Sequence, residues 1–287
     1  MQRVLKDLVD LLALERVDRD LFRGTSQDLG WGAIFGGQVL GQALSAAAQT
    51  VTPDRPVHSL HGYFIRAGAM TRPIVYQVDR LRDGKSFSTR RVVAIQEGEA
   101  IFSLEASFQT EEAGFEHQSA MPEVPSPDEL RSEREIALQF AAMLPSHVRT
   151  MATAERPIEI RPVDLRNPLA PKAHEPARKL WYRAVDRLPD DPALHRYLLA
   201  YASDFSFLGT ALDPHGVSWL TPGMQVASLD HSMWFHRPFR VDEWLLYAVE
   251  SPTASGARGL VRGQFFDRQG RLVASAMQEG LIRKRPA

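Results

Sequence analysis

The 287-residue chain contains no cysteine. That absence excludes disulfides, thiolate metal sites and a cysteine nucleophile, and it is typical of the reducing cytoplasm, where we expect this protein to act. Neither sign of charge is in excess, because the formal net charge is −1, and this argues against nucleic acid as a partner. No apolar run reaches the ~18 residues of a membrane-spanning helix, so we expect no membrane span.

Several catalytic motifs are missing as well. The sequence has no G-x-S-x-G elbow of a serine hydrolase and no G-x-G-x-x-G after a strand, so a dinucleotide site is not expected. His231 and His236 are five residues apart, and His58 and His61 are three apart, which places each pair on opposite faces of a strand. We therefore expect neither a metal nor a cofactor.

What the sequence does contain is one pattern written twice, at an offset of about 170 residues. LGQAL at 40–44 corresponds to LGTAL at 208–212, and IVYQVD at 74–79 corresponds to LLYAVE at 245–250. In both halves a helical run precedes four strand-like segments. A unit of this size present twice indicates a duplicated domain rather than a solenoid.

Each half is predicted to contain one central helix. The first follows the glycine-rich stretch 28–37 and runs to about Thr50; it has almost no charge and should be buried on most of its surface. The second begins at Asp191 as N-cap with Pro192 in the first turn, and it should continue to Leu212 with Asp204 in its middle.

These elements predict an α+β fold, a double hotdog in which two tandem repeats each wrap an antiparallel sheet around a long helix. The two sheets would join into one continuous sheet, which removes two exposed edges. We place the N-terminal repeat at residues 1–115, a proline-rich connection with one helix at 116–176, and the C-terminal repeat at 177–287.

Four blocks of sequence carry a family resemblance: GAIFGGQVLGQAL, DHSMWFHRPF, DEWLLY and ARGLVRGQFFDRQGRLVASAMQEG. Together they resemble the acyl-CoA thioesterase II family over nearly the whole chain. The resemblance implies hydrolysis of medium- to long-chain acyl-CoA to free fatty acid and CoA, by a homo-oligomer (dimer or tetramer). Two alternatives remain: a hotdog enoyl-CoA hydratase or dehydratase, and a non-catalytic acyl-CoA-binding sensor.

Asp204 is the first candidate for chemistry. It lies in YASDFSFLGTAL, among aromatic and small residues, where a carboxylate is costly unless it is hydrogen-bonded or used. A helix cap or a structural pair with an arginine would also explain it. The resemblance implies that Asp204 is the catalytic aspartate, either as general base on a water or as a nucleophile that forms an anhydride.

Ser228 and Gln278 are the other two catalytic candidates. In an extended strand Ser228 shares a face with Asp230, while His231 faces the other way. The same-face neighbours of Gln278 are all small and leave room for a ligand or a helix: Ala274, Ala276 and Gly280. The resemblance implies that the hydroxyl, usually a threonine in the family, and the glutamine orient the water and the aspartate.

Further positions are candidates for substrate binding. Gly36 and Gly37 open a helix whose free N–H groups suit a thioester oxygen or a phosphate, although close packing against the sheet would explain them as well. His58 falls near the N-terminal equivalent of Ser228. An apolar channel for the acyl chain is expected beside three aromatic side chains: Phe205, Phe207 and Trp234.

The two copies differ at the catalytic positions. In the repeat register Asp204 corresponds to Gly36, and Gln278 corresponds to Ala106. A glycine and an alanine can neither accept nor orient a proton. We therefore expect one catalytic site per chain, in the C-terminal copy.

Overall fold

The computed structural model describes residues 1–30 and 32–285, and all thirteen strands of these residues form one antiparallel sheet. The strands of the first half are β1 (Glu15–Asp18), β2 (Leu21–Gly24), β3 (Val57–Phe64), β4 (Ile74–Asp83), β5 (Phe87–Gln96) and β6 (Glu99–Gln109). Those of the second half are β7 (Ile158–Pro162), β8 (Ala177–Ala184), β9 (Met224–Ser228), β10 (Asp230–Phe235), β11 (Leu245–Ser255), β12 (Arg258–Asp267) and β13 (Leu272–Lys284).

The sheet order is β1-β2-β4-β5-β6-β3-β10-β13-β12-β11-β8-β7, with β9 paired to β13. The second half therefore repeats the first in reverse, and β3 meets β10 in the middle of the continuous sheet. The helices are α1 (Arg3–Leu12), α2 (Gly36–Ala48), α3 (Glu133–Gln139), α4 (Ser146–Thr153) and α5 (Pro192–Ser203). Short 3-10 turns are η1 (Pro127–Glu129), η2 (Ala141–Met143), η3 (Leu208–Ala211) and η4 (Asp213–His215).

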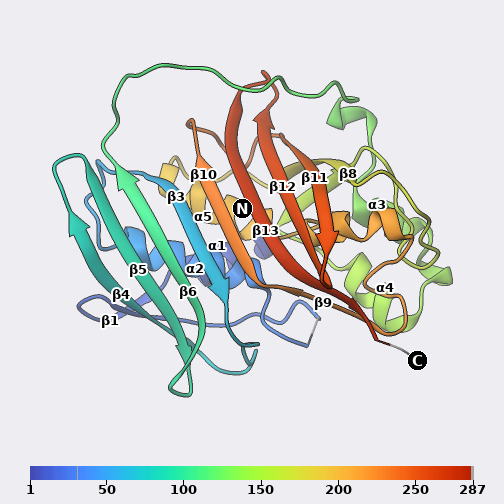
Figure 1. Ribbon diagram of the computed structural model, residues 1–287, viewed down its shortest axis with the longest axis horizontal. Helices are drawn as coiled ribbons and strands as arrows, with labels where there is room; N and C mark the ends of the chain where they lie inside the picture. Colours follow the sequence, from blue (N-terminus) through green and yellow to red (C-terminus); the bar gives the residue numbers. More distant parts are fainter. Residues whose placement is uncertain (31, 286–287) are drawn as a thin grey trace.

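Helices α1, α2 and α5 lie behind the sheet in Figure 1, and α2 packs directly on α5. As its composition predicted, α2 is buried along nearly its whole length. Two glycines allow the helices to approach closely: a Cβ on Gly37 would lie 2.3 Å from the Tyr201 carbonyl oxygen, and one on Gly41 would lie 3.1 Å from that of Tyr197. These contacts run in opposite directions along the two helices, so α2 and α5 are antiparallel.

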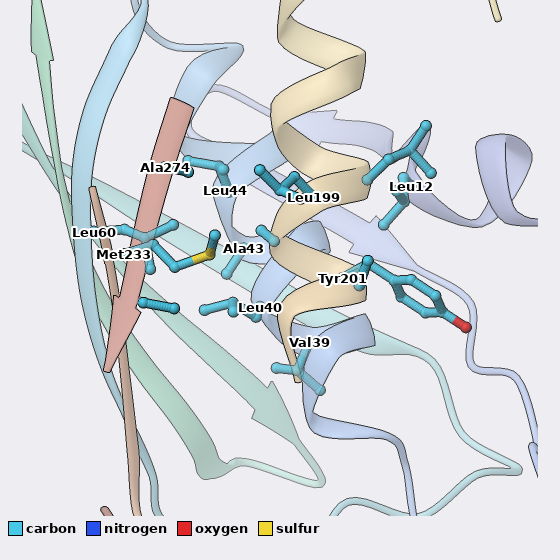
Figure 2. Packing of buried hydrophobic residues seen from close by; sticks show 14 of the residues in the cluster. Leu12, Val39, Leu40, Ala43, Leu44, Leu60, Leu199, Tyr201, Met233 and Ala274 are labelled. Atoms are coloured by element: carbon cyan, nitrogen blue, oxygen red, sulfur yellow. The ribbon is translucent and has the colours of Figure 1, made fainter. Parts of the chain in front are cut away.

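One hydrophobic core serves both halves. Figure 2 shows Leu40 and Leu44 of α2 and Leu199 of α5 beside Leu60 of β3 and Met233 of β10, with the strand residues directed toward the helices. Because residues of both halves belong to this one cluster and α2 packs on α5, the repeats form a single core rather than two separate ones. The predicted double hotdog is confirmed.

The predicted extent of the second helix is wrong. Asp191 does accept a hydrogen bond from Ala193 N, and Pro192 stands in the first turn, but α5 ends at Ser203 and Asp204 is its C-cap. Ser206 then has a left-handed backbone with φ of 57°, and the Phe205 carbonyl accepts a hydrogen bond from the Tyr182 hydroxyl at 2.8 Å. A left-handed residue cannot continue a right-handed helix, so the chain turns away after Asp204.

This early end also overturns one part of the repeat register. Residues 40–44 lie inside α2, whereas Leu208–Ala211 form the separate turn η3 beyond the end of α5. LGQAL and LGTAL are therefore not equivalent in space, and Gly36 is not the counterpart of Asp204.

The predicted connection crosses the top edge of the sheet in Figure 1 on its way from β6 to α3 and α4. The connection was predicted to contain one helix, but it contains two, α3 and α4, and β7 adds a sheet strand inside the stretch 116–176. The exact limits of the repeats stay a prediction. No helix within the described ranges is long and apolar enough to cross a membrane.

Candidate active site

Three side chains predicted from the sequence meet where α5 ends. Gln278 of β13 donates from Nε2 to Asp204 Oδ1 at 3.2 Å and also to Ser228 Oγ. Asp204 caps α5 and Ser228 closes β9, so each member comes from a different element. One amide thus links the carboxylate to the hydroxyl.

The N-terminus of α2 completes the surroundings of Asp204. The Gly37 N–H donates to Asp204 Oδ2 at 2.9 Å, and the positive end of the helix dipole favours the negative charge there. A Cβ on Gly36 would lie 2.8 Å from the same oxygen, so only glycine leaves room for the carboxylate. Gly36 therefore leaves space for the Asp204 carboxylate, and Gly37 allows the close contact between α2 and α5. The Gly37 N–H is hydrogen-bonded to Asp204 rather than free.

Burial raises the pKa of Asp204 from 3.8 to about 6, while the bonds from Gln278 and Gly37 lower it by less. Both bonds stabilise the ionised form, so the carboxylate is held in place without losing its basicity. A pKa close to the working pH is what a general base requires. Among the contacts of Asp204 in the described chain there is no arginine, which leaves the arginine-pair explanation without support.

His231 is a member of this site that sequence reasoning missed. Its ring is fully buried, and its Nδ1 lies 4.0 Å from Asp204 Oδ1. Strand alternation carried on from Ser228 placed His231 on the opposite face, but Leu229 separates β9 from β10 and interrupts that alternation. The usable signal was the alternation of His231 with the buried Met233 and Phe235.

The aromatic candidates divide between the two faces of the sheet. Phe205 borders the site, with its ring stacked on Phe35 at a centroid distance of 4.4 Å. Phe207 packs against the His231 ring at 5.7 Å. Trp234 alternates along β10 with the buried residues His231, Met233 and Phe235, so it points to the other face. There its ring centroid lies 5.2 Å from that of His61. Trp234 therefore lies on the opposite face of the sheet from the group around Asp204, and its contact with the acyl chain stays a prediction.

His58 also lies apart from the group around Asp204. Its Nε2 is 2.8 Å from Ser107 Oγ, and its ring meets Phe87 edge-on at 5.7 Å. The bulge in the pairing of β3 with β6 falls at His58, because Val57 pairs with Phe108 and Ser59 with Ser107. Val57 pairs with Phe108 as Ser228 pairs with Gly280, so Val57 rather than His58 lies at the position equivalent to Ser228.

The corresponding place in the first half is filled by an arginine. Ala106 lies opposite Arg90 in the β5–β6 pair, as Gln278 lies opposite Val261 in the β12–β13 pair. Arg90 is buried and donates to Thr50 Oγ1 at 2.8 Å and to the Thr50 carbonyl at 3.1 Å, just beyond the end of α2. A satisfied guanidinium therefore stands near the end of α2, whereas a carboxylate stands at the end of α5.

No three His, Cys, Asp or Glu side chains of the described residues are grouped as metal ligands would be. The site is instead a carboxylate, an amide, a hydroxyl and a neutral imidazole. Such a set can accept a proton and orient a small nucleophile beside an apolar wall.

Comparison with known proteins decides the family. Residues 147–281 match the sequence model described as acyl-CoA thioesterase, and residues 25–109 match that of the acyl-CoA thioesterase N-terminal domain. The chain is 45% identical to acyl-CoA thioesterase 2 of Haemophilus influenzae over 283 residues, 99% of each protein. This chain belongs to the acyl-CoA thioesterase family.

Two further similarities agree with that membership. Acyl-coenzyme A thioesterase 8 of Homo sapiens is 45% identical over 96% of this chain and 88% of its own length. The crystal structure of an acyl-CoA thioesterase II from Mycobacterium marinum superposes with a TM-score of 0.78 at 44% identity, covering 97% of this chain and 98% of that one. The protein is therefore a thioester hydrolase built on the double-hotdog fold.

Proposed function

We propose that the protein hydrolyses medium- to long-chain acyl-CoA with Asp204 as general base and with Ser228 and Gln278 as its partners. The supporting observation is the single amide of Gln278, which donates to both Asp204 Oδ1 and Ser228 Oγ. An arrangement fixed at both ends holds the carboxylate and the hydroxyl in one orientation before substrate arrives, which lowers the entropy cost of the reaction.

In the proposed reaction a water bound beside Asp204 and Ser228 attacks the thioester carbonyl carbon. Asp204 takes one proton of this water as the new carbon–oxygen bond forms, and the carbonyl oxygen becomes an oxyanion. Collapse of this intermediate breaks the carbon–sulfur bond, and Asp204 returns the proton to the CoA thiolate. The thiolate is a good leaving group, so a single base of raised pKa suffices.

Anhydride formation by direct attack of Asp204 is the second candidate mechanism. The hydrogen bond from Gly37 N–H to Oδ2 and the one from Gln278 to Oδ1 leave a free lone pair on each oxygen, and either role could use it. Single-turnover reaction in water enriched in a heavy oxygen isotope is the first test. Isotope in the Asp204 peptide would indicate the anhydride. Isotope only in the fatty acid would mean attack at the acyl carbon, and quenching with borohydride, which would reduce an aspartyl anhydride to homoserine, then separates an anhydride from direct attack by water.

The acyl chain is proposed to lie along the aromatic wall beside Asp204. Phe205 stacks on Phe35 and meets Tyr201 edge-on at 5.4 Å, and this wall is apolar and adjoins the carboxylate. We further propose that the chain assembles into a dimer or tetramer, which light scattering of the purified protein will test.

The deciding experiment is turnover of saturated acyl-CoA substrates of increasing length, with free CoA detected by a thiol reagent. Release of CoA that rises toward medium and long chains supports the proposal. A change in the acyl double bond without free thiol would instead indicate a hydratase or dehydratase, and tight binding without turnover would indicate a sensor.

A further inference from the structure

His231 lies beside the proposed catalytic group, and two of the polar atoms there lack partners. Its Nε2 is 2.9 Å from Ser203 Oγ. Its Nδ1 has no hydrogen-bond partner within the described residues, and the same holds for Gln278 Oε1. Buried polar atoms are nearly always bonded, so this pair requires an explanation.

The position of the ring proton decides what His231 can do. Burial lowers the pKa of His231 to about 3, and the neighbouring Gln278 side chain raises it by less. The ring is therefore neutral at pH 7 and carries one N–H, on either Nδ1 or Nε2. Which nitrogen holds it depends on the groups that each nitrogen faces.

The surroundings favour the proton on Nδ1. With the proton on Nε2, the bare Nδ1 would stand next to two more acceptors, Asp204 Oδ1 and Gln278 Oε1. With the proton on Nδ1, that N–H faces acceptors, and Nε2 can accept from the Ser203 hydroxyl, which otherwise donates to the Ala200 carbonyl at 2.8 Å. With the proton on Nε2, the ring would donate to Ser203 Oγ and that hydroxyl to Ala200, but Gln278 Oε1 would have no donor. Only the proton on Nδ1 supplies Gln278 Oε1 with a donor and leaves neither buried atom unpaired.

We propose that neutral His231, protonated at Nδ1, is a positioning residue that donates to Gln278 Oε1 and so fixes the orientation of the Gln278 amide. In this orientation Nε2 points at Asp204 and Ser228. A flipped amide would place Oε1 against the carboxylate and leave the Ser228 hydroxyl without its donor. The inference rests on the proposed hydrolysis at Asp204, and it adds a residue that touches neither water nor substrate.

A pair of isosteric variants tests this role. The side-chain amide nitrogen of asparagine reaches the position of histidine Nδ1, whereas that of glutamine reaches the position of Nε2. His231→Asn therefore keeps the donor to Gln278, and His231→Gln keeps only the contact with Ser203. We expect His231→Asn to retain most of the kcat and His231→Gln to lose roughly 10- to 100-fold, with KM unchanged in both.

His195 supplies a matched control. It is also buried on the same side of the sheet, and its Nδ1 accepts a hydrogen bond from Val241 N at 3.1 Å, at the other end of α5 from Asp204. His195→Gln should lower the unfolding temperature without changing the kcat of the folded enzyme. A substitution that only loosens the core lowers the folded fraction. After correction for the folded fraction, it leaves kcat unchanged.

A readout that needs no activity separates this inference from the proposed function. Nitrogen-15 NMR of the isotope-labelled chain reports which ring nitrogen of His231 carries the proton. The His231 signals are assigned by their loss in His231→Asn. An Nδ1–H signal supports the inference, and an Nε2–H signal overturns it. Equal kcat losses in the two variants, or a change in KM alone, would overturn it as well. Absence of CoA release by the wild-type chain would refute the proposed hydrolysis and leave the NMR result to decide the role of His231.

Discussion

Replacing Asp204 by asparagine should abolish most of the activity and yet stabilise the fold at neutral pH. The pKa of Asp204 rises from 3.8 to about 6 on folding, chiefly through burial. Because one pKa unit corresponds to about 1.4 kcal/mol, the ionised carboxylate destabilises the folded state by about 3 kcal/mol. Asparagine removes this charge, but its NH₂ group must face one of the two donors, Gly37 N–H or Gln278 Nε2, which costs ~1 kcal/mol.

The net expectation is a gain of about 2 kcal/mol for Asp204→Asn at pH 8. The gain depends on pH in a defined way. A folded-state pKa above the unfolded value means that the native protein binds more protons between pH 3.8 and about 6. The wild type therefore loses stability as pH rises through that window, and the advantage of the variant disappears at pH 4 and below.

Urea unfolding of both proteins at several pH values measures this difference, and turnover of acyl-CoA should fall roughly 10²- to 10⁴-fold in the variant. Asp242→Asn is a control of opposite sign. Burial raises the pKa of Asp242, but its bonds from Arg240 and Leu188 N–H outweigh burial and lower it, so asparagine there should destabilise at pH 8. If Asp204→Asn were less stable than the wild type at pH 8, or equally active, the assignment of a buried, raised-pKa base would be wrong.

Four other outcomes are expected. Ser228→Ala and Gln278→Ala should lower kcat more than they raise KM, because both act on the water rather than on CoA; a change in KM alone would reassign the residue to substrate binding. Gly36→Ala should displace the Asp204 carboxylate and reduce kcat, whereas Gly37→Ala should mainly lower the unfolding temperature, since its Cβ would meet a backbone carbonyl at 2.3 Å. The kcat of the wild type should rise with pH around a midpoint near 6, the pKa of Asp204, and a flat profile from pH 5 to 8 would contradict this. Active-site titration should count one turnover-competent site per chain, and two would contradict the asymmetry of the halves.

Local signals were enough to predict where the central helices begin and how deeply the first is buried. Asp191 caps α5 with its side chain, and Pro192 fits the first turn of the helix. The absence of charge in α2 predicted that no side of this helix faces solvent. The end of α5 was not predictable in the same way. It depends on Tyr182, which donates to the Phe205 carbonyl from a distant strand, and a pattern along one helix carries no record of that partner.

For the candidate site, too, local patterns identified some features, and contacts between distant elements determined the rest. Asp204 was distinguishable as a carboxylate among aromatic and small residues, but the catalytic roles of Asp204, Ser228 and Gln278 came from family resemblance, since the three residues lie on different elements. His231 was missed because the break at Leu229 shifts which residues share a face. Within β10 the alternation is regular, and it puts Trp234 on the face opposite the buried His231.

The asymmetry of the two halves follows from the ends of the two central helices. A carboxylate at the C-terminal end of α5 faces the unfavourable end of its own helix dipole, and it is tolerated because the antiparallel α2 directs the Gly37 N–H at it. A mirror site would need an acid at the end of α2 and free N–H groups at the start of α5. There Pro192 has no N–H, and the Asp191 carboxylate already accepts from Ala193 N. An acid added at the end of α2 would meet the Asp191 carboxylate instead of N–H donors. We therefore expect one site per chain, both from the way α5 begins and from the arginine that lies at the end of α2.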